Sequence, residues 1–362
     1  MTLHRTRAVF YRGGTSKALM FRIEDLPADR KDWDALFLAA MGSPDPNQRN
    51  LDGMGGGLSS LNKVCVVGPP SHAGADVDFT FVQLTPDTAV VDYSGNCGNM
   101  SSAIGSFAIE EGLIPAPADG EATVIIHNTN TGKLIRTRFP IEGGALASHG
   151  DLAIDGVAGT AAPIRLEFLE PGGAKTGTLL PTGNAVDVLE GIEASCIDAA
   201  NPCVFVRAAD LGKTGAELPG ELEADAAFMA RMEAIRRAGA AAMGLPLVAS
   251  IPKVAMLASP QNAPTLSGSL HANDHDLAVR MISVGQPHRA VPITGAVCLA
   301  VAARVEGAIA HQLCASQTGA IRIGHPSGTL LVDAEVAGGQ ALWGAVYRTA
   351  RRLFEGNVVW RR

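Results

Sequence analysis

Two stretches of the chain share one pattern: a polar turn with glycine, then small apolar residues, then a closing Glu-Gly. The first stretch runs from Cys97 to Gly112, and the second runs from Thr294 to Gly307. Each apolar run has the length of a helix, and we expect one helix at about 99–111 and another over 296–304. Helices of small residues can approach their neighbours closely, so each is expected at the centre of its own lobe. A length of 362 residues also favours two lobes over a single core.

Short apolar runs between glycine-containing turns surround both predicted helices. The 41 glycines follow no Gly-X-Y period and are typical of tight turns in an α+β protein. We place the lobe boundary after residue 180, giving an N-terminal lobe of residues 1–180 and a C-terminal lobe of residues 181–362, whose tail can return to the first lobe. Strands are predicted at 7–10, 18–21, 64–67, 77–84, 88–93, 122–127, 133–139, 164–168, 177–180, 203–207 and 252–258, and further helices at 31–41 and 224–242.

Charge and motif content exclude several classes of function. The formal net charge of −7 argues against a nucleic-acid partner, which would need a basic surface. No apolar run has the ~18 residues of a membrane span and the N-terminus has no signal-peptide pattern, so we expect a soluble, cytoplasmic protein. No Cys-x-x-Cys pair, dinucleotide fingerprint, phosphate loop, His-Glu-x-x-His or Gly-x-Ser-x-Gly motif is present, and we expect neither a cofactor nor a metal.

The turn Asn96–Asn99 begins the first predicted helix and places Cys97 at its start. Unpaired N–H groups and a partial positive charge at a helix N-terminus suit a carboxylate, and they also stabilise a thiolate. Cys97 is therefore a candidate reactive thiol. The alternative is an ordinary helix start with an inert thiol, and we interpret Cys65, Cys298 and Cys314 as small core residues.

Lys63 lies between a Gly/Ser loop and the apolar run Val64–Val67. A lysine at the mouth of a buried strand loses solvation, which favours the neutral amine that a general base requires. The alternative is a surface lysine at the start of a strand.

Further polar turns supply the N–H, hydroxyl and cationic groups that several carboxylates would need. Taken singly, each is also an ordinary capped turn. In chain order these turns and motifs are Arg12–Lys17 (RGGTSK), Gly42–Asp45 (GSPD), Asp52–Gly56 (DGMGG) with Lys63, Asn96–Asn99 (NCGN), Pro181–Asn184 (PTGN), His288-Arg289 and His325–Gly328 (HPSG).

This ordered set closely resembles the PrpF family, whose members include 2-methylaconitate cis–trans isomerases, methylitaconate isomerases and 4-oxalomesaconate tautomerases. The resemblance implies a diaminopimelate-epimerase-like α+β fold of two similar lobes, each a curved sheet around a central helix, with the active site in the cleft between them. It implies that Lys63 and Cys97 are catalytic and face the substrate from opposite sides, with Lys63 shuttling the proton. Substrate-binding residues are expected at Thr15, Ser16, Asn96, Gly98, Asn99, Ser101, Arg289, Thr294 and Gly295.

The expected substrate is a small polycarboxylate, and the expected enzyme is a cofactor-free isomerase that resembles 4-oxalomesaconate tautomerases. A 2-methylaconitate or methylitaconate isomerase is the alternative, because Asp52–Gly56 and Ser94–Asn99 look closer to the methylaconitate enzymes. An amino-acid epimerase would need two facing thiols, but the second half has Thr294-Gly295 where a partner cysteine is expected. A non-catalytic carboxylate-binding protein also remains open, and so does the choice between a monomer and a homodimer.

Overall fold

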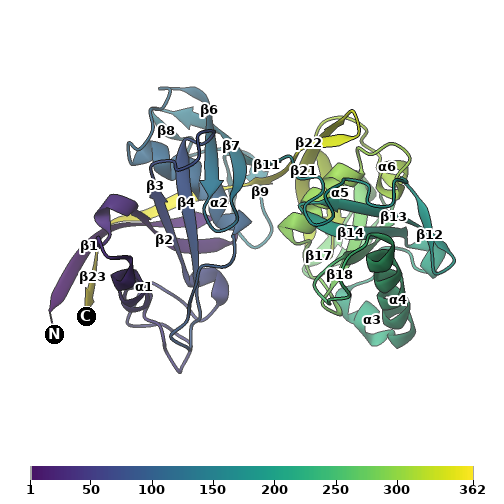
Figure 1. Ribbon diagram of the computed structural model, residues 1–362, viewed down its shortest axis with the longest axis horizontal. Coiled ribbons are helices and arrows are strands. Elements are labelled where there is room, and N and C mark those ends of the chain that lie inside the picture. Colours follow the sequence, from purple (N-terminus) through teal and green to yellow (C-terminus); the bar gives the residue numbers. More distant parts are fainter. Residues whose placement is uncertain (1, 362) are drawn as a thin grey trace. The chain divides into compact units, whose positions relative to one another are not determined.

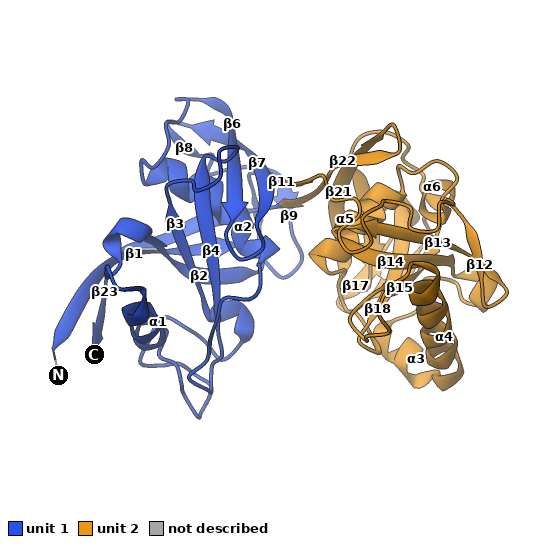
Figure 2. Ribbon diagram, viewed as in Figure 1, with its two compact units in different colours: residues 1–166, 348–362 blue, residues 167–347 orange. Residues whose placement is uncertain are grey.

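The computed structural model describes residues 2–361, which divide into two compact units (Figure 2). Residues 1–166 and 348–362 make up unit 1, and residues 167–347 make up unit 2. The division after Leu166 precedes the boundary that we placed after residue 180. The chain ends in unit 1, where the last strand pairs with the first.

Unit 1 is a mixed sheet with one buried helix, α2, and a second helix, α1 (Figure 1). Across the sheet, neighbouring strands follow the order β23-β1-β2-β3-β4-β6-β7, with β5 beside β4 and β8 beside β7. The strands are β1 (Leu3–Gly13), β2 (Ser16–Arg22), β3 (Lys63–Gly68), β4 (Val77–Leu84), β5 (Val91–Asp92), β6 (Gly120–Asn128), β7 (Lys133–Glu142), β8 (Ala145–Leu146), β9 (Leu152–Ala153), β10 (Thr160–Ala161), β11 (Ile164–Leu169) and β23 (Ala350–Arg361), and the helices are α1 (Trp33–Met41) and α2 (Gly98–Glu110).

Unit 2 repeats this plan around the buried helix α5, with the additional helices α3, α4 and α6 (Figure 1). The helices are α3 (Pro219–Ala224), α4 (Ala226–Ala242), α5 (Ile293–Ala302) and α6 (Ile309–Leu313). The strands are β12 (Asp187–Leu189), β13 (Ile192–Ala199), β14 (Asn201–Arg207), β15 (Lys253–Ala258), β16 (Ala263–Thr265), β17 (Gly268–Leu270), β18 (Leu277–Ser283), β19 (Gln286–Pro287), β20 (Ile321–His325), β21 (Gly328–Ala337) and β22 (Gln340–Arg348). The strand predicted at 177–180 is wrong, because these residues form bends.

The two units share one sequence of strand pairings. In unit 1, β1 and β2 are antiparallel, β2 and β3 parallel, β3 and β4 antiparallel, β4 and β6 parallel, and β6 and β7 antiparallel. In unit 2, β13, β14, β15, β18, β20 and β21 pair with the same alternation. By this correspondence Lys63, the first residue of β3, matches Lys253, the first residue of β15. The internal repeat seen in the sequence is therefore a repeat of the whole unit.

The two faces of the unit 1 sheet carry different helices. Val64 and Val66 of β3 belong to an apolar core that also contains Leu36 and Phe37 of α1. Because successive side chains in a strand point to opposite faces, Lys63 faces the other side, where α2 lies. Helix α2 is buried from Met100 to Ile109. Among the helices within the described residues, none is long and apolar enough to cross a membrane, and the cytoplasmic location stays a prediction.

Candidate active site

The Lys63 amine is enclosed by side chains of unit 1, and the residue is only 9% exposed. Its Nζ donates a hydrogen bond to Oε1 of Gln83, the register partner of Lys63 on β4, at 3.0 Å. The same Nζ lies 3.5 Å from Sγ of Cys97 and 5.1 Å from the centre of the Phe81 ring. The structure thus brings together the two residues that the sequence singled out as catalytic.

Gln83 is itself fixed by the backbone around it. Its Nε2 donates to the carbonyl oxygens of Ser59, Asn62 and Leu84 at 2.9–3.0 Å, which leaves Oε1 directed at Lys63. Since a carbonyl oxygen only accepts hydrogen bonds, Gln83 orients the lysine as a donor.

The DGMGG loop packs against Asn62, the residue that precedes β3. Asn62, which precedes Lys63, is fully buried and donates through Nδ2 to the carbonyl oxygens of Gly56 and Leu58. A Cβ at Gly55 would lie 2.2 Å from Oδ1 of Asn62 and 2.5 Å from the Met41 carbonyl oxygen. Glycine is required there by close packing, so this motif positions Lys63 rather than contributing a reactive group.

Cys97 is the N-cap residue of α2 and makes no capping bond with its side chain. Its carbonyl oxygen accepts from the backbone N–H of Ser101 at 2.9 Å and from the Ser101 hydroxyl at 3.1 Å. The Ser101 hydroxyl lies 3.4 Å from Oδ1 of Asn96, which also accepts from Asn128 at 3.2 Å. Asn96 and Ser101, both expected to bind substrate, therefore hold the turn that presents Cys97. The N–H groups of Gly98 and Asn99 lie in the first helical turn, where no intrahelical acceptor exists for them.

The turn between β1 and β2 packs directly on the start of α2. A Cβ at Gly14, whose φ is +50°, would lie 2.3 Å from Oδ1 of Asn99, and a Cβ at Gly13 would lie 2.5 Å from the Asn99 carbonyl oxygen. Nδ2 of Asn99 donates to the hydroxyl of the exposed Thr15 at 3.1 Å, while Ser16 is buried. Glycine is therefore required at positions 13 and 14 for the β1–β2 turn to pack this closely on the start of α2.

Arg348 completes this group and was not found from the sequence. Its Nε donates to Oδ1 of Asn99 at 3.1 Å, and its Cδ would lie 3.2 Å from a Cβ at Gly14. Burial lowers the pKa of Arg348 to about 10. At neutral pH the guanidinium stays charged. No motif marks this residue, which follows the apolar run of β22 and meets partners far earlier in the chain.

Two other motifs of unit 1 have local structural roles. The carboxylate of Asp45 accepts from the backbone N–H groups of Asn47, Arg49 and Asn50, and these hydrogen bonds hold its pKa below its usual range. Arg12 donates to the carbonyl oxygens of Gly14 and Thr349 and so fixes the RGGTSK turn.

The remaining predicted binding residues belong to unit 2 and lie at the beginning of α5. Arg289 and Thr294 are exposed and Gly295 is buried; a Cβ at Gly295 would lie 2.6 Å from Sδ of Met281. Burial and the positive charge of Lys253 lower the pKa of His288. These residues belong to unit 2, whereas Lys63 and Cys97 belong to unit 1.

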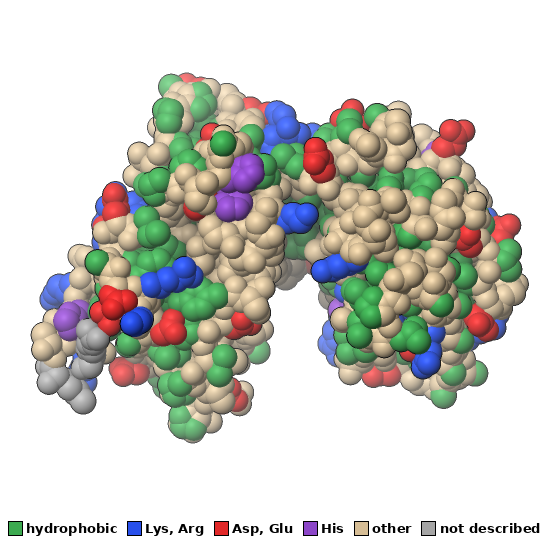
Figure 3. Space-filling view, in the orientation of Figure 1, with side chains coloured by type: hydrophobic (Ala, Val, Ile, Leu, Met, Phe, Trp, Pro, Cys, Tyr) green, Lys and Arg blue, Asp and Glu red, His purple; other side chains and the backbone are tan. Residues whose placement is uncertain are grey.

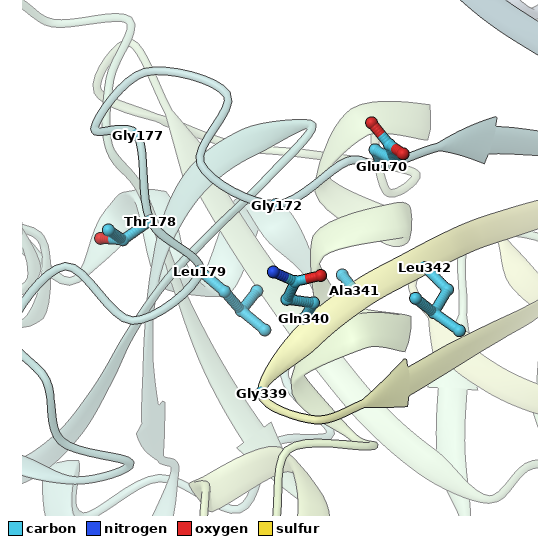
Figure 4. A pocket seen from close by; sticks show the side chains of 9 residues that line it. All are labelled: Glu170, Gly172, Gly177, Thr178, Leu179, Gly339, Gln340, Ala341 and Leu342. Atoms are coloured by element: carbon cyan, nitrogen blue, oxygen red, sulfur yellow. The ribbon is translucent and has the colours of Figure 1, made fainter.

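A cavity of about 470 Å³ in unit 2 is drawn in Figure 4. The cavity contains none of the residues predicted from the sequence, and its single charged side chain is that of Glu170, so it does not suit a polycarboxylate. The cavity is lined by Glu170, Gly172, Gly177, Thr178, Leu179, Gly339, Gln340, Ala341 and Leu342.

The surface and the metal-binding side chains were searched as well. On the face shown in Figure 3, acidic and basic side chains are mixed on both units. Within residues 2–361, no cluster of three or more His, Cys, Asp or Glu side chains has the arrangement of a metal site.

Comparison with known proteins gives consistent results over the whole chain. The sequence profile of the family described as PrpF protein matches residues 3–361. The chain is 41% identical to the 2-methyl-aconitate isomerase of Shewanella oneidensis, with 98% of this chain and 96% of the relative covered. It is 39% identical to the 3-methylitaconate isomerase of Eubacterium barkeri (98% and 97% covered) and 40% identical to the (4E)-oxalomesaconate Delta-isomerase of Novosphingobium sp. (97% and 96% covered).

A solved structure of methylitaconate-delta-isomerase matches with a TM-score of 0.93 at 38% identity, covering 99% of this chain and 96% of that chain. The diaminopimelate-epimerase-like α+β fold expected from the sequence, with one central helix in each half, is confirmed by this match.

Proposed function

Since the chain belongs to the PrpF protein family and is an isomerase, we propose that it moves a proton on an unsaturated di- or tricarboxylic acid, using Lys63 and Cys97 and no cofactor. The observation that carries the proposal is the 3.5 Å separation of the Lys63 amine and the Cys97 sulfur at the start of α2. Both atoms can hold a proton, and both residues are only 9% exposed.

The reaction needs one proton removed and one returned. A base takes the proton from a carbon next to a carboxylate or keto group, and the C–H electron pair delocalises into an enolate-like anion. A proton then returns to a different carbon, or to the same carbon after rotation about a bond of the anion. Lys63 is proposed as the base and then the acid. Cys97 is either a second acid–base group or a polar wall of the site.

The developing negative charge has to be met by donors that are already in place, which is commonly the largest single contribution to catalysis. The backbone N–H groups of Gly98 and Asn99 have this role in the proposal, because they belong to the first turn of α2 and act with its positive end. Ser16 and Arg289 are proposed as further donors. Thr15, Asn96, Ser101, Thr294 and Gly295 remain proposed binding residues.

The substrate we propose first is 4-oxalomesaconate, with 2-methylaconitate or methylitaconate as the alternative. Relatives named for each of the three activities are 39–41% identical to this chain, so sequence identity does not separate them. An amino-acid epimerase is disfavoured by Cys298, which is buried and donates to the carbonyl oxygen of Ile197 rather than lying at the turn that begins α5.

Proton NMR in D2O tests the reaction and the substrate together. The purified protein is incubated separately with oxalomesaconate, methylaconitate, methylitaconate and trans-aconitate, and each spectrum is followed with time. Isomerisation of one of these acids, with solvent deuterium entering the product, is the expected result. If none of them changes while the protein is folded, the proposed reaction class is wrong; conversion of methylaconitate alone would contradict the first choice of substrate only.

A further inference from the structure

Asn128 is a fully buried side chain whose hydrogen bonds reach the turn before α2. It is the last residue of β6. Its Oδ1 accepts from the backbone N–H of Thr131 at 3.0 Å and from the Thr131 hydroxyl at 2.7 Å. Its Nδ2 lies 3.2 Å from Oδ1 of Asn96 and 3.4 Å from Oδ1 of Asn130. Both polar atoms of this amide therefore have partners within unit 1.

The backbone determines which way the amide of Asn128 points. A backbone N–H can only donate, so it requires the oxygen of Asn128 beside Thr131. If the amide were turned over, its NH2 group would face that N–H, and the buried donors would lose their acceptor. The NH2 group of Asn128 is consequently directed at Asn96, and Asn96 has to offer its oxygen in return.

The orientation of the Asn96 amide follows from this contact. The other group near its Oδ1 is the Ser101 hydroxyl at 3.4 Å, whose single proton has a shorter bond of 3.1 Å to the carbonyl oxygen of Cys97. Asn128 is thus the donor that holds Oδ1 of Asn96. Asn96 itself is exposed, and within residues 2–361 its Nδ2 makes no hydrogen bond. The amide has its acceptor on the buried side and its donor on the exposed side.

We infer that Asn128 is the positioning residue that turns the amide of Asn96 so that its NH2 group is offered to a carboxylate of the substrate. An amide turned the other way would present an oxygen, which cannot donate to a carboxylate and repels it. Asn96 directly precedes Cys97, the N-cap of α2, so its donor lies next to the unpaired N–H groups of the first helical turn. Neither the sequence motifs nor the family comparison assigns a role to Asn128. The identity of the ligand rests on the proposed function, whereas the orientation of the amide does not.

Asn128→Asp removes the donor and keeps the acceptor. Aspartate has nearly the shape of asparagine and can still accept from Thr131, but it has no proton for Asn96. The Asn96 amide is then expected to turn over and to donate its own NH2 group to the new carboxylate. Asn130→Asp is the matched control, because it adds the same charge two residues away and also removes an amide donor, here one that binds two backbone carbonyl oxygens. Its carboxylate can still accept from Asn128.

NMR of the free protein, with isotopic nitrogen in its asparagines, measures the orientation without any ligand. The side-chain NH2 signal of Asn96 is identified as the one that disappears in Asn96→Ala. In Asn128→Asp these protons are expected to shift downfield and to exchange with water more slowly, since they become hydrogen-bonded. Asn130→Asp should leave both properties unchanged. An Asn96 signal that is the same in Asn128→Asp and in the wild type would overturn the inference.

Calorimetric titration with trans-aconitate tests the consequence for the ligand. Asn128→Asp is expected to raise Kd by about tenfold or more, as the loss of a hydrogen bond to a charged group does, while Asn130→Asp stays near the wild-type value. In the Asn96→Ala background the same substitution should change Kd by less than about twofold, because a residue that acts through Asn96 then has nothing to orient. An undiminished loss in that background would reveal a general effect of charge or structure and would refute the orienting role.

If Asn128→Asp does not fold, Asn128→Ser takes its place in both experiments. Serine is uncharged and one bond shorter, so it no longer donates to Asn96, and a changed Asn96 signal with weaker binding is again expected; no change in either would refute the inference. If trans-aconitate does not bind the wild type, the carboxylate ligand of the proposed function is wrong, and the NMR signals still decide whether Asn128 orients Asn96. If it binds all variants equally, the orienting role is wrong and the proposed reaction is unaffected.

Discussion

Two neighbours of the Lys63 amine limit what it can do in catalysis. Gln83 offers a fixed acceptor on one side, and the sulfur of Cys97 lies on the other side at 3.5 Å. The amide can only accept a hydrogen bond from the amine, whereas the sulfur can give or take a proton. Of these two neighbours, only the sulfur of Cys97 can therefore exchange a proton with Lys63.

Replacing the two residues one at a time distinguishes a single-base from a two-base mechanism. Lys63→Met is expected to lower turnover by at least ~10²-fold, the loss typical of a positioned acid or base, with little change in melting temperature. If Cys97→Ser keeps a tenth of the activity, one base carries the proton and the sulfur only shapes the site. If both changes are equally severe, a two-base mechanism is favoured.

The control for this comparison is Lys133→Met, which removes an exposed lysine from the start of β7 and is expected to keep full activity. Near-normal turnover in Lys63→Met would contradict the assignment of Lys63 as the base.

Alkylation of the wild-type protein tests the accessibility of Cys97. The reagent should modify Cys97 faster than Cys65 or Cys298, because burial raises the pKa of those two thiols. Saturating trans-aconitate should slow the reaction at Cys97 if the carboxylates occupy the start of α2.

Helix α2 carries the site at one end and is anchored by charges at the other. Glu110, its last residue, accepts from the Tyr11 hydroxyl at 2.9 Å and from Arg352 at 2.8 Å. The following Glu111 has a side chain only 1% exposed and pairs with Arg7 and with Arg352. These contacts join α2 to β1 and β23, so the first and last strands of the chain both fix the helix that presents Cys97.

Glu111→Gln is expected to lower the free energy of unfolding at pH 7 by about 1–3 kcal/mol, because it removes a buried carboxylate charge that Arg7 and the partly buried Arg352 pair with. Although burial opposes its charge, hydrogen bonds from Arg7 and Arg352 hold the pKa of Glu111 below its usual value. A lowered carboxyl pKa contributes stability above the unfolded value of about 4.3 and loses it as the pH falls through the folded value. Denaturant unfolding should therefore show the two proteins converging below about pH 4.

Glu355→Gln is the matched control, since Glu355 also pairs with Arg352 but its side chain is 63% exposed. It should change stability by no more than about 1 kcal/mol at any pH, as expected of a surface pair. A Glu111→Gln variant as stable as this control at pH 7 would show that the α2 anchor is not electrostatic.

At the scale of the whole molecule, local patterns predicted the central helices and the residues at their starts better than the sheets. The turn Asn96–Asn99 and the run after it contain their own glycine, cap and apolar signals, so α2 was placed within a residue of its observed bounds. Strand β18 was missed because all seven of its residues are buried, Arg280 included, and the sequence shows no alternation. Arg348 was missed because its partners, Gly14 and Asn99, are distant in sequence and only the fold brings them together.

The last prediction concerns what the whole protein must supply for turnover. Lys63 and Cys97 account for the proton that moves, and the N–H groups at the start of α2 account for the charge that develops, so the proposed reaction has no step that calls for a metal ion or a nucleotide. Prolonged dialysis against a chelator, followed by the NMR assay, is expected to leave turnover unchanged. A parallel measurement of bound metals in the undialysed protein distinguishes a metal that was never present from one that was retained. Activity that disappears on dialysis and returns with a divalent cation would refute the cofactor-free mechanism while leaving the proton transfer itself to be re-examined with that ion bound.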